Sequence, residues 1–279
     1  MTAPVHYVGK LLCLSLFIIP SPLVEAKKVS HSEISTTCSY YHAEAAGNKT
    51  FARSARSKAV TARLAAAQRA AARKAELKMI SLEANILFAE MQLADSGLDE
   101  KVLEYALMGY HRLLKKHTLH NTDILTICDF SQSSSLKRMY VIDMRTRQLL
   151  YRNYVAHGIS SGGEFANSFS NAPESHKSSL GFYVTRNTYY GENGLSLRID
   201  GMDRGFNSLA GERNIVIHGA PYVSERILHK YGVMGTTFGC PAIPEELTDQ
   251  LIPLLKDGSC FFIYYPSKRY LKNSSVLNG

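Results

Sequence analysis

Hydrophobic and polar positions change their period near residue 122 of this 279-residue chain. Before that point, apolar residues recur every three or four positions, which is the spacing of one helix face. A helix is predicted over residues 98–117. Its apolar face consists of Val102, Leu103, Ala106, Leu107, Tyr110, Leu113 and Leu114. Residues 51–94 are rich in alanine and poor in helix breakers, so they also favour a helix.

After residue 122 the apolar runs become short and rich in β-branched and aromatic residues, which is typical of strands. About seven strands are predicted, over residues 124–130, 137–144, 148–156, 180–186, 195–200, 214–219 and 260–265. One more helix is predicted over residues 245–258, where two glutamates suit the positive N-terminal end and Gly258 lies at the other end. The expected fold class is α+β, with a mainly β body and helical N-terminal additions.

The first 26 residues have the pattern of a cleavable export signal. Lys10 precedes the short apolar run 11–19, and Val24 and Ala26 provide small residues before a cut after Ala26. The run is far shorter than the roughly 20 residues that a membrane-spanning helix needs. We therefore expect an exported, periplasmic protein; an uncleaved N-terminal anchor is the alternative.

Positive charge is concentrated in one segment. The net charge is +8, from 32 Lys and Arg against 24 Asp and Glu. Residues 51–78 hold 8 of the basic residues and only one acidic residue, Glu76, which leaves 24 against 23 elsewhere. Nucleic acid is therefore not expected as a partner. We interpret the segment as a solvated spacer helix whose later half docks; an electrostatic tether to an anionic envelope surface is the alternative.

Four cysteines follow the signal: Cys38, Cys128, Cys240 and Cys260. The sequence has no CxxC or HExxH spacing, so no metal site is expected. Cys128 and Cys260 lie in apolar runs and are interpreted as buried small hydrophobes. The sequence does not identify a disulfide partner for Cys38. Cys240 differs from the others, because it lies between a glycine and a proline, outside any strand pattern.

His218 precedes Cys240 by 22 residues and ends the strand-like run Asn-Ile-Val-Ile. A cysteine becomes a nucleophile when a neighbouring imidazole takes its proton, and a backbone carbonyl can fix the tautomer of that imidazole. These two residues alone leave two interpretations open, a catalytic pair or two unrelated loop residues. His157 repeats the His-Gly pattern but is interpreted as structural, and His229 is expected to face solvent.

The residues around this pair resemble the murein L,D-transpeptidase catalytic-domain family, exported bacterial enzymes that remodel peptidoglycan. The family combines a His-Gly or His-Ser strand end with a Ser/Thr-x-Gly-Cys turn, which correspond here to 218-HGAPY-222 and 237-TFGC-240. The stretch 178-SSLGFYVTR-186 looks like the family's substrate-side strand. The resemblance covers roughly residues 98–266. It implies a β-sandwich-like catalytic domain that needs no metal or organic cofactor.

The resemblance also implies roles for individual residues. Cys240 would be the nucleophile, with a lowered thiol pKa, and His218 its general base, oriented by the carbonyl of Gly219. The backbone amides around Phe238, Gly239 and Cys240 would form the oxyanion site. Substrate contacts are expected at Tyr222, Thr237, Ser179 and Gly181. The chain departs from the commonest form of the family at Phe238 and Ala242, and its turn matches a branch with an aromatic-Gly-Cys-Pro-Ala sequence.

The implied organisation is a signal peptide over 1–26, a polar and then Ala/Arg-rich helical region over 27–94, a catalytic domain over 95–266 and a C-terminal tail over 267–279. The implied reaction acylates Cys240 with a tetrapeptide stem and releases D-alanine. An amine of another stem, or of a wall-attached protein, then resolves the thioester and forms a 3→3 crosslink or a protein attachment. Two alternatives remain: a hydrolase such as an L,D-carboxypeptidase, and a non-catalytic peptidoglycan-binding protein.

Overall fold

The computed structural model describes the backbone of residues 38–279 and the side chains of residues 56–279. The expected signal peptide and the Cys38 side chain lie outside the described residues. The chain divides into two compact units within helix α1 (Cys38–Glu90), one ending at Ala65 and the other spanning Ala66–Gly279. In the second unit, α1 becomes apolar toward its end and buries Ile80, Ala84 and Leu87. This burial agrees with the prediction that the later half of this helix docks.

One mixed sheet of eight strands forms the body of the second unit, in the order β3-β2-β1-β8-β4-β5-β6-β7. The strands are β1 (Ile124–Asp129), β2 (Met139–Asp143), β3 (Gln148–Asn153), β4 (Gly181–Gly191), β5 (Gly194–Gly201), β6 (Val216–Ala220), β7 (Ala242–Pro244) and β8 (Cys260–Tyr264). Neighbours are antiparallel except β1 with β8 and β6 with β7, which are parallel. The predicted α+β, mainly β fold class is confirmed. Sequence reasoning missed β7, because three residues carry no periodicity.

The remaining elements are short helices apart from α3. They are α2 (Leu93–Ser96), α3 (Glu100–Lys115), α4 (Glu225–Tyr231), α5 (Thr248–Leu255), α6 (Lys268–Asn273) and α7 (Ser275–Asn278), with single 3-10 turns at Ile159–Ser161 and Glu245–Leu247. The Asp99 carboxylate accepts a hydrogen bond from the Lys101 amide at 2.7 Å and so caps the start of α3. The helix predicted over 245–258 is shorter than expected, because a 3-10 turn takes up its first residues.

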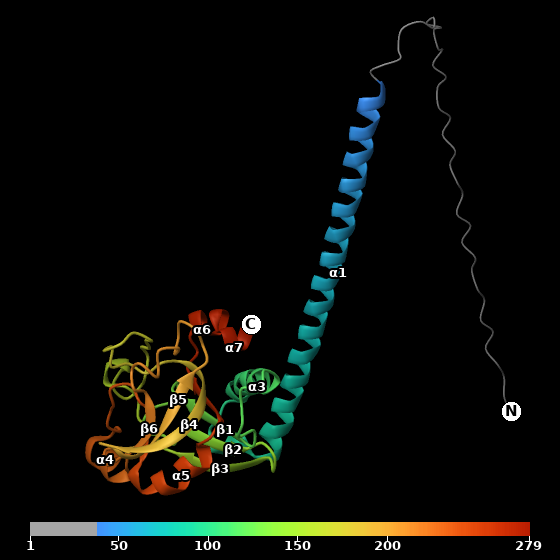
Figure 1. The fold of residues 1–279 in the computed structure, drawn as a ribbon. Helices are drawn as coiled ribbons and strands as arrows, with labels where there is room; N and C mark the ends of the chain where they lie inside the picture. Colours follow the sequence, from blue (N-terminus) through green and yellow to red (C-terminus); the bar gives the residue numbers. More distant parts are fainter. Residues whose placement is uncertain (1–37) are drawn as a thin grey trace, which may run out of the picture. The chain divides into compact units, whose positions relative to one another are not determined.

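Helices α3 and α5 cover opposite faces of the sheet (Figure 1). On one face, Gly109 of α3 lies directly against the ring of Phe182, which stacks on Phe262 with centroids 4.1 Å apart. On the other face, the Thr185 hydroxyl donates a hydrogen bond to the Leu255 carbonyl of α5 at 2.6 Å. Both contacts use the middle strands, so the centre of the sheet is the core of the domain.

The segment expected as a C-terminal tail, 267–279, forms α6 and α7 and docks onto a buried carboxylate. Asp203 is fully buried and accepts hydrogen bonds from the Tyr270 hydroxyl at 3.0 Å, the Ser274 hydroxyl at 2.6 Å and the Val276 amide at 3.0 Å. It also accepts from the Phe182 amide of β4 at 3.0 Å. A buried charge is tolerated when several donors satisfy it, and these donors fix the C-terminal helices to the sheet.

No helix within residues 38–279 is both long enough and apolar enough to cross a membrane. In the same part of the chain, no three His, Cys, Asp or Glu side chains come together as a group that could hold a metal ion.

Replacing Gly109 by alanine is expected to destabilise the domain. An added Cβ would lie 2.0 Å from the Phe182 ring, inside the core. Overpacking typically costs about 1–3 kcal/mol, which exceeds the gain of about 1 kcal/mol that alanine brings to a helix. Urea unfolding should therefore show a lower free energy of unfolding for Gly109→Ala. The matched control is Gly211→Ala, where an added Cβ meets nothing within 4 Å; equal stability of the two variants would contradict this account.

Candidate active site

His218 lies in the middle of β6, where the strand register pairs it with Ser196 of β5 and Ala242 of β7. The side chain is only 3% exposed. Its Nδ1 lies 2.9 Å from the carbonyl oxygen of Gly219. Because a carbonyl only accepts hydrogen bonds, Nδ1 carries the proton and Nε2 keeps its lone pair. Burial lowers the pKa of His218, so the ring is a neutral base at neutral pH.

Gly219 follows His218 in β6 and lies close to α5. A Cβ at this position would lie 2.2 Å from the Thr248 hydroxyl oxygen of α5. Only glycine therefore fits between β6 and α5. Because side chains alternate across a strand, His218 points to the face of the sheet away from α5.

Cys240 lies in the turn that leads into β7, partly exposed and beside the start of β6. The Val216 amide points at its Sγ at 3.5 Å, and the Sγ–H points at the Asn214 carbonyl at 3.6 Å. The parallel pairing of β6 with β7 therefore brings the cysteine and the histidine to neighbouring positions of one sheet edge. Among the described residues, His218 Nε2 has no hydrogen-bond partner, and the thiol proton faces a backbone carbonyl.

The thiol of Cys240 does not have the lowered pKa that the sequence predicted. Burial raises the pKa of this thiol, while the Val216 amide and the charge of Arg213 lower it to a smaller extent. With the pKa of His218 lowered as well, both residues are uncharged at neutral pH. The resting site is a neutral thiol and imidazole rather than an ion pair.

One of the backbone amides expected to form the oxyanion site already makes a hydrogen bond within the turn. The Gly239 amide donates to the Thr237 hydroxyl oxygen at 2.9 Å, and this hydroxyl in turn donates to the Cys240 carbonyl at 2.8 Å. Thr237 thus closes the turn, and its expected contact with a substrate stays a prediction. In the described part of the chain, the amides of Phe238 and Cys240 have no acceptor. These two amides are the donors available to an oxyanion.

Residues 156–178 hold the turn in place. The Thr237 amide donates to the His157 carbonyl at 3.0 Å, and the Ser178 hydroxyl donates to the Gly239 carbonyl at 3.3 Å. The Gly158 amide donates to the same Ser178 hydroxyl at 3.0 Å. The turn that carries the cysteine is therefore fixed by groups far from it in the sequence.

His157 is structural, as the sequence predicted. It is 1% exposed, and its Nδ1 accepts a hydrogen bond from the fully buried guanidinium of Arg138 at 2.7 Å. Since an arginine only donates, the proton of His157 lies on Nε2, which faces the Gly162 carbonyl at 3.2 Å. Burial and the charge of Arg138 lower the pKa of His157 to about 4.

Arg213 is a site residue that sequence reasoning missed. Its guanidinium donates to the Ser170 carbonyl at 2.9 Å, the Lys177 carbonyl at 2.6 Å and the Ser179 hydroxyl. It also lies behind the nucleophile turn, since a Cβ on Gly239 would be 3.2 Å from its Nη2. Among the described residues it has no carboxylate partner, so its charge acts on Cys240. No local motif marks it, because every partner is at least 26 residues away in sequence.

Two aromatic residues of the expected site are Phe238 and Tyr222. Phe238 is 72% exposed and stacks on His176, with centroids 4.5 Å apart. Tyr222 is half-buried, and burial, together with the charge that Cys240 carries as a thiolate, raises the pKa of its hydroxyl. The role of Tyr222 as a pocket wall stays a prediction. The sequence gave no signal for His176. His229 lies on α4 and is exposed, as expected.

The substrate contacts expected at Ser179 and Gly181 stay predictions, and both positions are buried in this structure. The Ser179 hydroxyl is used by Arg213 and by the Ser170 carbonyl. Gly181 has a φ of +119°, and a Cβ there would lie 2.6 Å from the Asp203 carboxylate. These positions shape the interior behind the site. Cys128 and Cys260 are fully buried free thiols, as expected.

The low pKa of His157 predicts a loss of stability in acid. Between pH 6.5 and about 4, the unfolded chain binds a proton at this residue and the folded chain does not. The free energy of unfolding should fall across this window by up to about 3 kcal/mol from this residue. His157→Gln retains an acceptor for Arg138 and a donor for Gly162 but does not titrate. Urea unfolding at pH 7, 5.5 and 4.5 should show a smaller decline for this variant; parallel curves would contradict the assignment.

Removing the charge of Arg213 is expected to raise the pKa of Cys240 further. In Arg213→Met the pH midpoint of Cys240 alkylation by iodoacetamide should move upward, because the nearest cation to the thiolate is lost. Arg213→Lys keeps the charge and should shift the midpoint less. Peptide mass spectrometry identifies the labelled cysteine, since Cys128 and Cys260 are inaccessible. An unchanged midpoint in Arg213→Met would show that this cation does not act on the thiol.

Comparison with known proteins places this site in a family. No curated protein matches the chain. A solved L,D-transpeptidase from Mycobacterium smegmatis is similar over 51% of this chain and 59% of its own, with 11% identity and a TM-score of 0.31, which is too low to support an inference. The family model of the L,D-transpeptidase catalytic domain matches residues 94–264, more than half of the chain and nearly the region of the expected resemblance. The chain therefore belongs to the L,D-transpeptidase catalytic-domain family.

Proposed function

We propose that this protein is a peptidoglycan L,D-transpeptidase that uses Cys240 as nucleophile and His218 as general base. The family acts on the stem peptides of peptidoglycan. The observation that carries the proposal is the hydrogen bond from His218 Nδ1 to the Gly219 carbonyl. It leaves Nε2 unprotonated on the same sheet edge as the cysteine, as a general base requires.

In the first half-reaction, Nε2 of His218 takes the thiol proton as Sγ of Cys240 turns away from the Asn214 carbonyl. The thiolate attacks the carbonyl carbon of the third residue of a tetrapeptide stem. The amides of Phe238 and Cys240 donate to the oxygen as it becomes negative, and the fixed charge of Arg213 stabilises the anionic site. The bond to the terminal D-alanine then breaks, and its amine leaves with the proton from His218, so that a thioester remains.

In the second half-reaction, an acceptor amine loses its proton to His218 and attacks the thioester. The thiolate leaves and recovers a proton from the imidazolium, which restores the neutral pair. With an amine of a second stem the product is a 3→3 crosslink, and with an amine of a wall protein it is an attached protein. The partly exposed turn and the exposed Phe238–His176 stack leave room for an acceptor beside the thioester.

Action on the wall agrees with an exported, periplasmic location, and we keep the signal peptide over 1–26 as part of this proposal. The exposed basic stretch of α1, from Arg56 to Lys78, would stay at the anionic envelope surface. Nothing in the proposed reaction requires a metal or an organic cofactor.

Incubating the full-length protein with disaccharide-tetrapeptide should release D-alanine and give a crosslinked dimer, measured by product mass. Cys240→Ala should abolish both products, since no thioester forms. His218→Gln should reduce the rate by about 10²–10⁴-fold, the usual contribution of a general base. His229→Gln, on exposed α4, is the matched control and should behave as the wild type.

The same masses distinguish the alternatives. Tripeptide without dimer would indicate a hydrolase that resolves the thioester with water. Unchanged tetrapeptide with the wild type would contradict catalysis and favour a non-catalytic, wall-binding role. Full activity of Cys240→Ala or His218→Gln would remove that residue from the mechanism.

A further inference from the structure

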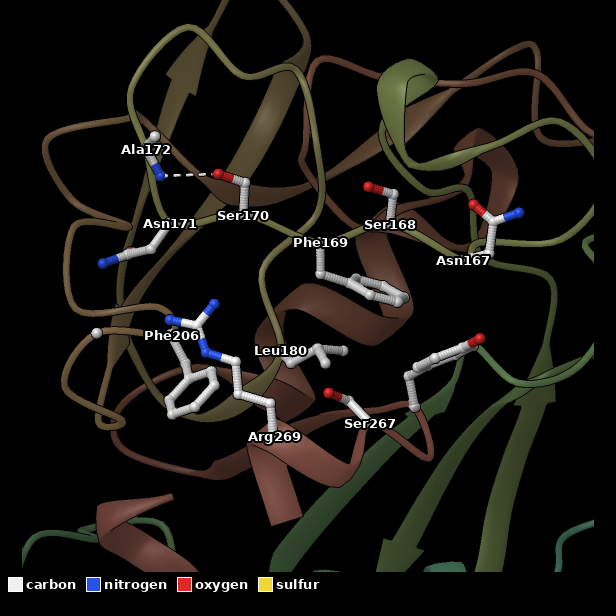
Figure 2. A pocket seen from close by; sticks show the side chains of 12 residues that line it. Asn167, Ser168, Phe169, Ser170, Asn171, Ala172, Leu180, Phe206, Ser267 and Arg269 are labelled. Atoms are coloured by element: carbon white, nitrogen blue, oxygen red, sulfur yellow. Dashed lines mark hydrogen bonds between the residues drawn. The ribbon is translucent and has the colours of Figure 1, made fainter. Parts of the chain in front are cut away.

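Figure 2 shows a concave site that is lined by residues outside the catalytic turn. It has a volume of about 480 Å³ and lies between the loop 167–172 and the chain that follows β8. This size is typical of small-molecule sites, which span roughly 300–1,000 Å³. Neither Cys240 nor His218 lines it, so the proposed reaction does not account for it.

The pocket presents polar groups that the protein itself does not use. The side-chain amide of Asn167, the hydroxyl of Tyr265 and the guanidinium of Arg269 have no hydrogen-bond or ion-pair partner among the described residues. By contrast, the Ser170 and Ser267 hydroxyls are engaged with nearby backbone amides. Free groups gathered in one concavity indicate a polar ligand, because each of them can gain a partner there.

The charge in the pocket lining is positive. Arg269 is the only charged residue among the twelve that line it. Its side chain extends over Phe206, with the guanidinium 5.8 Å from the ring centroid. A planar guanidinium held in this way favours a carboxylate over a neutral group.

Aromatic faces form the rest of the lining. Phe169 and Tyr265 lie against each other at an angle of 45°, with centroids 4.9 Å apart, and Phe206 also lines the pocket. Such rings hold a ligand that has an apolar face as well as polar edges. A free inorganic anion has no apolar face, and a purely apolar ligand leaves Arg269 and Asn167 without partners. The lining therefore favours a ring that bears hydroxyl groups and a carboxylate.

We propose that this pocket binds an acidic saccharide, with the carboxylate on Arg269, hydroxyl or N-acetyl groups on Asn167 and Tyr265, and a sugar face on the aromatic rings. This inference deepens the proposed function and rests on it only for the source of the saccharide, a peptide-free N-acetylmuramic acid unit of the glycan strand. The pocket is connected to the catalytic turn, because Arg213 donates to the Ser170 carbonyl in the pocket wall and lies behind Gly239.

Calorimetric titration of the full-length protein with three probes tests the proposal. N-acetylmuramic acid has the ring and the carboxylate, N-acetylglucosamine has the ring alone, and the dipeptide L-Ala-D-Glu has carboxylates alone. We expect N-acetylmuramic acid to bind about tenfold more tightly than N-acetylglucosamine, because a charge-assisted hydrogen bond is lost in the second case. Arg269→Gln should remove this difference. Tyr265→Phe keeps the ring and should weaken both sugars, and Arg145→Gln on the exposed β2–β3 turn should change nothing.

Equal binding of the two sugars, or an unchanged preference in Arg269→Gln, would overturn the proposal. Binding of the dipeptide but of neither sugar would also overturn it, because the pocket would then be a peptide site. D-Alanine release from the tetrapeptide, measured on the same preparations, keeps the two proposals separate. Release without sugar binding would reject the pocket alone, and sugar binding without release would reject the transpeptidase alone.

Discussion

The close crossing of three chain segments at Gly158 is the constraint on which the site depends. A Cβ at this position would lie 2.5 Å from the His176 carbonyl, 2.9 Å from the Ser178 amide and 3.0 Å from the Gly239 Cα. Only a residue without a side chain allows the three backbones to meet. Because they meet there, the cysteine turn, the Phe238 stack and the buried Ser178 hydroxyl all have fixed positions.

The close approach of the backbone segments at Gly158 also has an electrostatic consequence. Bringing backbone so close together removes water from the thiol and the imidazole, which favours their uncharged forms. A buried ion pair would need more hydrogen bonds than the turn supplies, since Thr237 already uses the Gly239 amide. The resting site therefore keeps a neutral pair, with one cation, Arg213, behind the turn. In the proposed mechanism, charge separation becomes favourable only once a substrate carbonyl receives the negative charge.

How much the sequence could predict follows from the range of each interaction. Most strands and α3 depend on neighbours along the chain, and local patterns found them. The same patterns placed a strand end at His218, whereas β6 continues to Ala220. Arg213, His176 and Ser178 function through partners on other segments, and no local pattern marks them. The burial of Ser179 and Gly181 was not predicted, because a motif gives residue types and order but not which side of a strand faces water. The raised pKa of Cys240 was missed for a related reason, since burial depends on the whole fold.

The position of Arg213 also explains how binding away from the turn would reach the nucleophile. The guanidinium N–H groups of Arg213 link the loop at Ser170 to the backbone behind Gly239. A planar guanidinium has little freedom to move once several acceptors hold it. A ligand that fixes the loop would restrict the positions that the Arg213 guanidinium occupies. The electrostatic field at Cys240 would change as a result. The effect would appear as a change in the pKa of the thiol rather than as a movement of the sheet, because β6 and β7 are held by their own ladder.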